Sequence, residues 1–148
     1  MERNPKPYLQ DSFAIDNETV EDVKGQIGNA ELVDHSRRLV KKLWNVAEGV
    51  WCFVGNGLSN QTFVEGPEGL IVIDTGECVE EMAEALVAIR KETQSPIAAV
   101  IYTHFHYVAG TKAVFTSEER DDIPIWGHER IAMNRRSYGT ELSAVASR

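Results

Sequence analysis

Two histidines separated by one residue, His104 and His106, have the types and spacing best suited to chemistry in this chain. They follow an apolar run over residues 97–101 that predicts a short buried strand. In extended backbone, residues i and i+2 project from one face, so both imidazoles can converge on one metal ion. Open α/β sheets place their sites at this end of the strands, which favours a metal site over two solvated loop histidines.

Hydrophobic patterning predicts the elements that must position this pair. Apolar runs around short glycine-containing loops predict two β-hairpins, over residues 43–54 and 61–73. Apolar residues on one face and glutamates on the other predict a helix over about 78–93. A short helix over 110–115 and a brief strand over 123–126 follow the histidines. The predicted fold class is therefore α/β, and it opens with four mostly antiparallel strands.

Two tryptophans and one aspartate have specific places in this scheme. We expect Trp44 and Trp51 to belong to the core between the sheet and the helices. Asp74 follows the strand over residues 70–73, where an aspartate can cap the next helix or support a site.

The polar N-terminal stretch contains two prolines and two glycines, and it predicts an extended arm over residues 1–29 with a turn of helix at residues 20–23. Such an arm is normally ordered by what it packs on, for example a partner subunit. A short helix is predicted over residues 30–40, at the start of a domain that runs from 30 to 148.

The composition limits the class of protein. With 148 residues, 43% hydrophobic and 26% charged, the chain fits one soluble globular domain. Its net charge of -8 argues against nucleic-acid binding but is compatible with small anionic substrates. Cys52 and Cys78 lie far apart in the sequence, which favours two buried thiols in a reducing compartment. We expect a cytoplasmic protein without membrane contact, because no run reaches transmembrane length and no apolar signal core is present.

Three motifs, in this order, resemble the metallo-β-lactamase superfamily. They are Asn-Gln-Thr-Phe-Val at 60–64, Gly-Leu-Ile-Val-Ile-Asp-Thr-Gly at 69–76, and Ile-Tyr-Thr-His-Phe-His at 101–106. Within the superfamily, the residues are most similar to the alkyl sulfatase branch, for example at Trp51 and at Gly-Asn-Gly-Leu-Ser-Asn over 55–60. The resemblance covers about residues 46–148 and implies an αβ/βα sandwich of two sheets between helices.

The resemblance also implies a site with zinc, held in the family by an HxHxDH motif and normally as two ions. Here the histidine pair runs directly into Val108-Ala109-Gly110, so the Asp-His pair has no counterpart. Only His104 and His106 carry over as metal ligands. Downstream, the His128-Glu129 pair could add a ligand, although in the family this segment is usually a strand-to-helix turn.

Three further residues receive roles from the same resemblance. Asp74 is expected to orient the metal-binding loop. Tyr107 is expected either to donate a hydrogen bond to a substrate oxygen or simply to pack, and Asn60 to line the mouth of the site.

The family domain continues with further strands and ligands, so residues 30–148 are expected to form only its N-terminal half. Half of a sandwich exposes a broad apolar face, and we therefore expect a homo-oligomer or association with the missing C-terminal part.

Two classes of function follow. The first is a metal-dependent hydrolase acting on a small anionic ester, with alkyl sulfate esters as the expected substrate. A lactonase or thioesterase type of the same superfamily is a variant of this class. The second is a non-catalytic or structural relative with a degenerate metal site, which the missing Asp-His pair favours.

Overall fold

The computed structural model describes residues 18–37 and 39–137, and its contacts divide the chain into two units, Met1–Val40 and Lys41–Arg148. No helix within these described ranges is both long enough and apolar enough to cross a bilayer.

The first unit contains a small hairpin and a helix. Strands β1 (Thr19–Glu21) and β2 (Ile27–Asn29) pair antiparallel, and α2 (Ala30–Ser36) follows directly. The turn is held by the Asp22 carboxylate, which accepts hydrogen bonds from the Lys24 and Gln26 amides, both at 2.8 Å. The Asn29 side chain caps α2 by accepting from the Glu31 amide at 2.9 Å.

The predictions for this region need correction. The helical turn expected at residues 20–23 is wrong, because Asp22 makes a turn that pairs the flanking segments as strands. In the structure α2 contacts the hairpin and the contacts divide after Val40, while the predicted domain boundary after residue 29 stays a prediction. The expected extended arm therefore contains a hairpin, and residues 1–17 of that arm lie outside the described residues.

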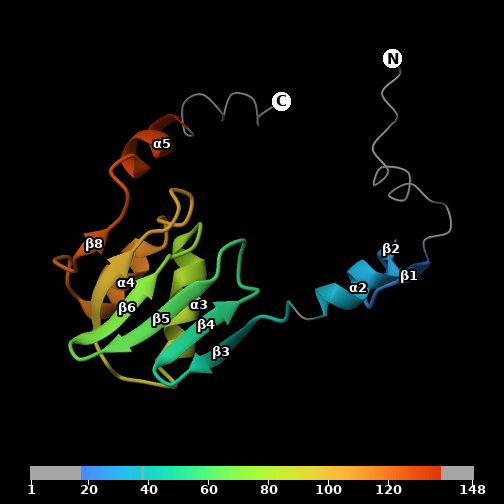
Figure 1. Ribbon diagram of the computed structural model, residues 1–148, viewed down its shortest axis with the longest axis horizontal. Helices are drawn as coiled ribbons and strands as arrows, with labels where there is room; N and C mark the ends of the chain where they lie inside the picture. Colours follow the sequence, from blue (N-terminus) through green and yellow to red (C-terminus); the bar gives the residue numbers. More distant parts are fainter. Residues whose placement is uncertain (1–17, 38, 138–148) are drawn as a thin grey trace, which may run out of the picture. The chain divides into compact units, whose positions relative to one another are not determined.

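The second unit is built on a six-stranded sheet with the order β3-β4-β5-β6-β7-β8 (Figure 1). The strands are β3 (Lys42–Ala47), β4 (Val50–Val54), β5 (Gln61–Gly66), β6 (Gly69–Ile73), β7 (Ile97–Ile101) and β8 (Ile125–Trp126). The first four form consecutive antiparallel pairs, and β6, β7 and β8 run parallel. This arrangement confirms the predicted hairpins and the α/β class.

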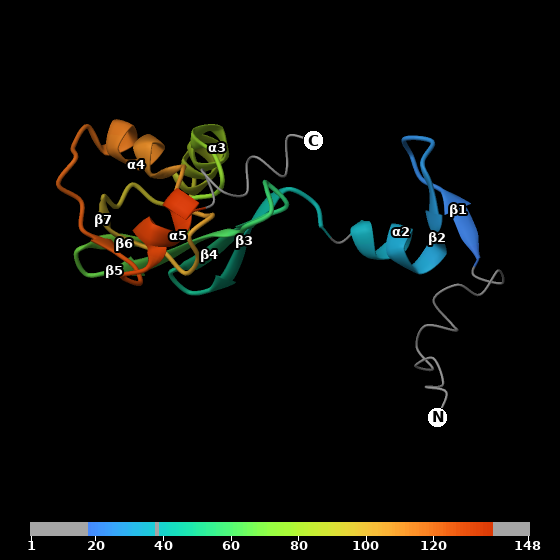
Figure 2. The same cartoon turned by 90° about the horizontal axis from the view of Figure 1, so that it is seen from above.

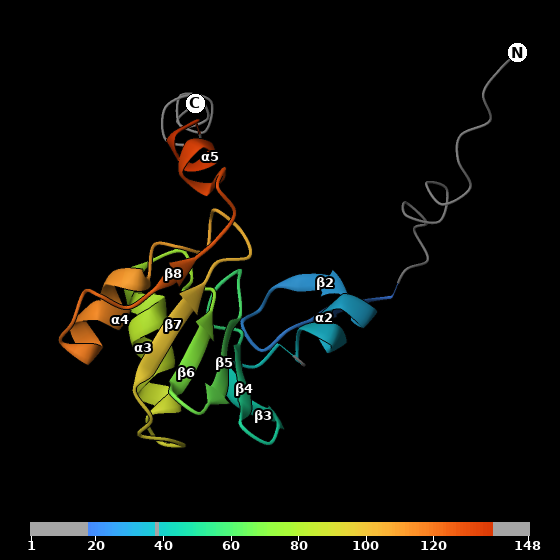
Figure 3. The ribbon, with the colours of Figure 1, turned by 60° about the vertical axis from the view of Figure 1, so that its left-hand side comes forward.

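Helices α3 (Val79–Ile89) and α4 (Thr111–Glu118) lie on the same face of the sheet (Figure 2). Helix α5 (Ile131–Ser137) follows β8, as Figure 3 shows. The core lies between the sheet and the two packed helices. Its fully buried members include Phe63, Leu70, Val72, Met82, Ala85, Ile89, Ile97, Val100 and Val114.

The two predicted core tryptophans have different environments. Trp51 is buried as expected, whereas Trp44 is 44% exposed. Trp44 pairs with Cys52, the residue next to Trp51, so the alternation of side chains sends the two indoles to opposite faces of the sheet. The expectation for Trp44 was therefore wrong.

The sheet face opposite α3 and α4 is apolar and only half-buried. Among the described helices, α3 and α4 are the ones that contact strands of this six-stranded sheet. The half-buried apolar side chains on the other face include Val50, Cys52, Val54, Val64, Ile71, Ile73, Ala99 and Ile101. Such a face suits a covering layer, and the expected association stays a prediction.

Candidate functional site

One edge of the sheet collects the loops that carry the candidate residues. The register pairs Phe53 with Gln61 and Thr62 with Ile73. Ile73 in turn pairs with Ile101. The loops after β4, β6 and β7 therefore emerge together, as expected for a sheet whose site lies at the carboxyl ends of its parallel strands. Asn60, Asp74 and the histidine loop lie at this edge.

The two histidines contact each other directly. His104 Nε2 lies 2.6 Å from His106 Nδ1, and the ring centroids are 4.7 Å apart. The backbone here is a turn and not the extended segment expected from the sequence, since the Tyr107 amide donates to the His104 carbonyl at 3.2 Å. The turn, and not the pleat of a strand, brings the two imidazoles together.

Aromatic rings surround the pair. The Phe105 ring lies 3.9 Å from the His106 ring and 4.6 Å from the His104 ring, centroid to centroid. The half-buried Tyr107 ring is 5.2 Å from the His104 ring. Tyr107 therefore borders the imidazoles, and hydrogen bonding by its hydroxyl to a substrate stays a prediction.

Asp74 is positioned to hold this loop. It is only 7% exposed and has the positive φ of 60°. Its carboxylate accepts from the Thr103 amide at 2.8 Å and from the Thr103 hydroxyl at 2.5 Å. Thr103 is the residue directly before His104, so Asp74 anchors the start of the histidine loop.

The other two candidates differ in their surroundings. Asn60 is exposed at the same edge, and its predicted contact with substrate stays a prediction. His128 is also exposed, and its Nδ1 accepts from the Arg130 amide at 3.2 Å while its carbonyl accepts from the Ile131 amide at 3.0 Å. These bonds place His128 at the strand-to-helix turn before α5.

A second polar group at this edge was not predicted from the sequence. The side-chain amide of Asn56 donates to the backbone carbonyl of Glu81 at 2.7 Å. The Glu81 carboxylate accepts from the backbone amide of Glu77 at 2.8 Å. A Cβ at Gly57 or at Gly76 would lie 2.6 Å from that carboxylate, so both glycines make room for it. The glycines in these two loops were the sequence signal that could have indicated a closely packed side chain here.

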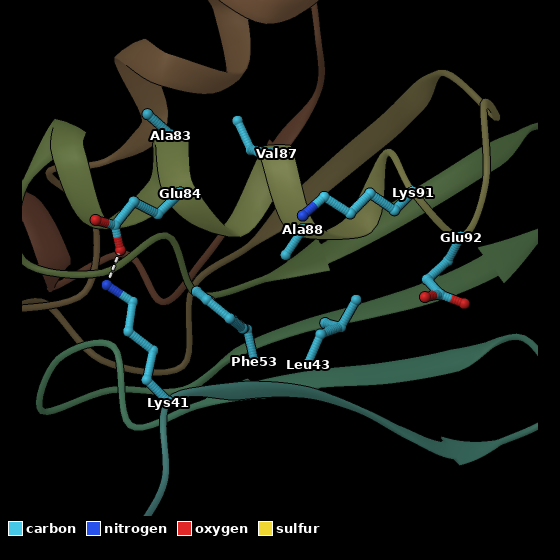
Figure 4. Close-up of a pocket in the computed structure, with 9 residues that line it drawn as sticks. All are labelled: Lys41, Leu43, Phe53, Ala83, Glu84, Val87, Ala88, Lys91 and Glu92. Atoms are coloured by element: carbon cyan, nitrogen blue, oxygen red, sulfur yellow. Dashed lines mark ion pairs between the residues drawn. The ribbon is translucent and has the colours of Figure 1, made fainter.

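A separate cavity of about 640 Å³ lies between α3 and strands β3 and β4 (Figure 4). An ion pair between Lys41 and Glu84 crosses it. None of its lining residues comes from the loop that carries the histidines, so we do not assign it to the candidate site. The lining residues are Lys41, Leu43, Phe53, Ala83, Glu84, Val87, Ala88, Lys91 and Glu92.

The histidine pair does not by itself form a zinc centre. Two imidazole nitrogens on one tetrahedral zinc would be separated by about 3.3 Å, so the 2.6 Å separation is that of a mutual hydrogen bond. In the part of the chain that the structure describes, no group of three or more His, Cys, Asp or Glu side chains could hold a metal ion. A zinc site needs at least one further ligand and a wider separation of the two rings.

Residues 54–107 match the metallo-β-lactamase superfamily, and this match contains Asp74 and both histidines. This stretch, about a third of the chain, is similar to the metallo-β-lactamase superfamily. Within that superfamily, the similarity is to alkylsulfatases, as the motifs around Trp51 had indicated.

Two curated relatives show how much of a superfamily member this chain spans. A linear primary-alkylsulfatase of Pseudomonas sp. (strain ATCC 19151) is 40% identical over 87 residues, which cover 55% of this chain and 16% of the relative. The alkyl/aryl-sulfatase BDS1 of Saccharomyces cerevisiae is 36% identical over 75 residues, which cover 49% of this chain and 12% of the relative. The chain thus spans about one-sixth or less of their length.

Solved structures show the same fold. The stereoselective inverting sec-alkylsulfatase Pisa1 from Pseudomonas sp. superposes with a TM-score of 0.65 at 18% identity, covering 84% of this chain and 23% of that one. A metallo-β-lactamase from Hirschia baltica superposes with a TM-score of 0.54 at 19% identity, and the match covers 66% of this chain and 48% of that one. The described sheet and helices therefore belong to a metallo-β-lactamase fold.

Proposed function

We propose that the protein containing this chain hydrolyses alkyl sulfate esters, and that the edge with His104 and His106 forms part of its active site. The observation that carries this proposal is the anchored histidine loop. The superfamily match includes both histidines, and Asp74 fixes the loop at the carboxyl edge of the sheet. The similarity to alkylsulfatases supports the choice of a sulfate ester over other esters.

The pair can contribute in a definite way. At 2.6 Å, one N–H is shared between His104 Nε2 and His106 Nδ1, so an imidazole at this exposed edge can hold or pass a proton. We propose zinc as the cofactor of the complete protein, with these two nitrogens among its ligands; when bound, the ion would replace the N–H that they share. The remaining ligands would come from outside the described residues.

A non-catalytic relative is the competing function. The observation that favours it is the direct contact between the two imidazoles, in a chain that lacks the Asp-His pair. Hydrolysis of a lactone or a thioester remains a variant of the first proposal. Location in the cytoplasm and assembly with a partner chain stay predictions.

Metal analysis and a substrate panel distinguish these functions. We expect the purified protein to retain zinc by elemental analysis and to release sulfate from dodecyl sulfate faster than it opens an acyl lactone or cleaves a thioester. Faster lactone or thioester cleavage would replace the sulfatase by another hydrolase. A protein without bound metal and without activity on any of the three substrates would support the non-catalytic relative.

A further inference from the structure

Two consecutive residues directly after β6, Asp74 and Thr75, anchor the histidine loop on both sides. Asp74 binds Thr103, directly before His104. Thr75 binds the carbonyl of Tyr107, directly after His106, through its amide at 2.9 Å and through its hydroxyl at 3.1 Å. The short segment with both imidazoles is thus fixed at each end by the strand end that follows β6.

The anchor on the far side belongs to a cluster of three hydroxyl groups. The Thr75 hydroxyl lies 3.1 Å from the Thr111 hydroxyl, and both residues are buried. The Thr111 hydroxyl donates to the Val108 carbonyl at 3.0 Å and is also bonded to the Tyr102 hydroxyl. Burial raises the pKa of Tyr102, so its phenol stays protonated and available to donate.

The start of α4 packs closely on this cluster. A Cβ at Gly110 would lie 1.9 Å from the Thr75 carbonyl oxygen, so only glycine allows the backbone to approach this far. That approach brings Thr111, the first residue of α4, within reach of Thr75 and Tyr102. Residues before the histidines (Tyr102) and after them (Tyr107 and Val108) are therefore hydrogen-bonded to the same buried cluster.

We propose that Thr75, Thr111 and Tyr102 are positioning residues, whose hydroxyl cluster holds the histidine loop so that the two imidazoles face each other. The cluster closes the loop at the place where this chain runs directly from Tyr107 into Val108-Ala109-Gly110. The use of the imidazole pair in hydrolysis rests on the proposed function, whereas the positioning itself does not.

Nuclear magnetic resonance of the whole chain tests this role. In Thr111→Val, which removes a hydroxyl but keeps the branched shape, we expect the ring ¹⁵N signals of His104 and His106 to shift as their mutual hydrogen bond changes. The Thr75 amide should exchange with solvent about tenfold faster, as expected for the loss of roughly 1.4 kcal/mol of hydrogen bonding.

Three further variants control the experiment. Thr111→Ser restores the hydroxyl and should return the ring signals towards those of the unmodified protein. Thr116→Val removes a hydroxyl from the same helix, but that hydroxyl is exposed and donates to the Lys112 carbonyl at 2.9 Å, away from the cluster, so the ring signals should not move. Tyr102→Phe removes one oxygen from the cluster and makes the test if Thr111→Val does not fold.

Unchanged imidazole signals in a folded Thr111→Val or Tyr102→Phe protein would overturn the positioning role. The outcome is independent of hydrolysis. If the signals shift as expected but the unmodified protein releases no sulfate, the proposed function fails and the positioning role stands. If sulfate is released but the signals do not respond, the positioning role alone fails.

Discussion

The Asp74→Ala variant is expected to lose about 3 kcal/mol of its free energy of unfolding. The buried carboxylate accepts two hydrogen bonds from Thr103, and alanine would leave the Thr103 amide and hydroxyl without that acceptor. Alanine also tolerates the φ of 60° less well than aspartate, whose side chain can bond locally. Urea unfolding, followed by tryptophan fluorescence to which the buried Trp51 contributes, measures the change.

Two variants separate the contributions at Asp74. Asp74→Gly removes the same bonds but accepts a positive φ, so it should unfold at a higher urea concentration than Asp74→Ala. Asp122→Ala removes an exposed carboxylate that bonds Arg120 at 2.5 Å, and it should lower the free energy of unfolding far less than Asp74→Ala does. A loss below about 1 kcal/mol for Asp74→Ala would show that the carboxylate does not anchor the loop.

Gly110→Ala is the second variant with a large expected effect, again a loss of about 3 kcal/mol. Its Cβ would lie 1.9 Å from the Thr75 carbonyl oxygen and 2.6 Å from the Met82 Cβ, so backbone must move to accept it. For a domain of this size, the unfolding temperature should fall by roughly 10–15 °C. Differential scanning calorimetry measures that shift.

Gly66→Ala is the matched control for Gly110→Ala. A Cβ at Gly66 would lie 3.6 Å from the Gly69 carbonyl oxygen, which is an ordinary contact. We expect its unfolding temperature to stay within a few degrees of the unmodified protein, because alanine fits without movement of the backbone. Equal shifts for the two variants would contradict the close approach of α4 to Thr75.

Local patterns were sufficient for most of the second unit. The hairpins, α3 and the strand before the histidines were predicted because each depends on apolar periodicity within about ten residues. The fate of Trp44 was not predictable in this way, since its face depends on a pairing with Cys52. The turn at Asp22 was missed although its Asp-Val-Lys-Gly sequence is a turn signal.

The site was only partly predictable for a related reason. The residue types and the place of His104 and His106 followed from the strand before them. The closed geometry of the loop did not, because Thr75 reaches Tyr107 and Thr111 across 32 and 36 positions of sequence. The same holds for Asn56 and Glu81, which are 25 positions apart. Such contacts appear only once the loops of the sheet edge are brought together.

Sulfate release from dodecyl sulfate, compared between His106→Ala and His128→Ala of the whole protein, tests the assignment of the active site most directly. Both histidines lie outside the core, but only His106 faces His104. We expect a fall of about 100-fold or more for His106→Ala and a rate close to that of the unmodified protein for His128→Ala. Full sulfate release by a folded His106→Ala protein would contradict it.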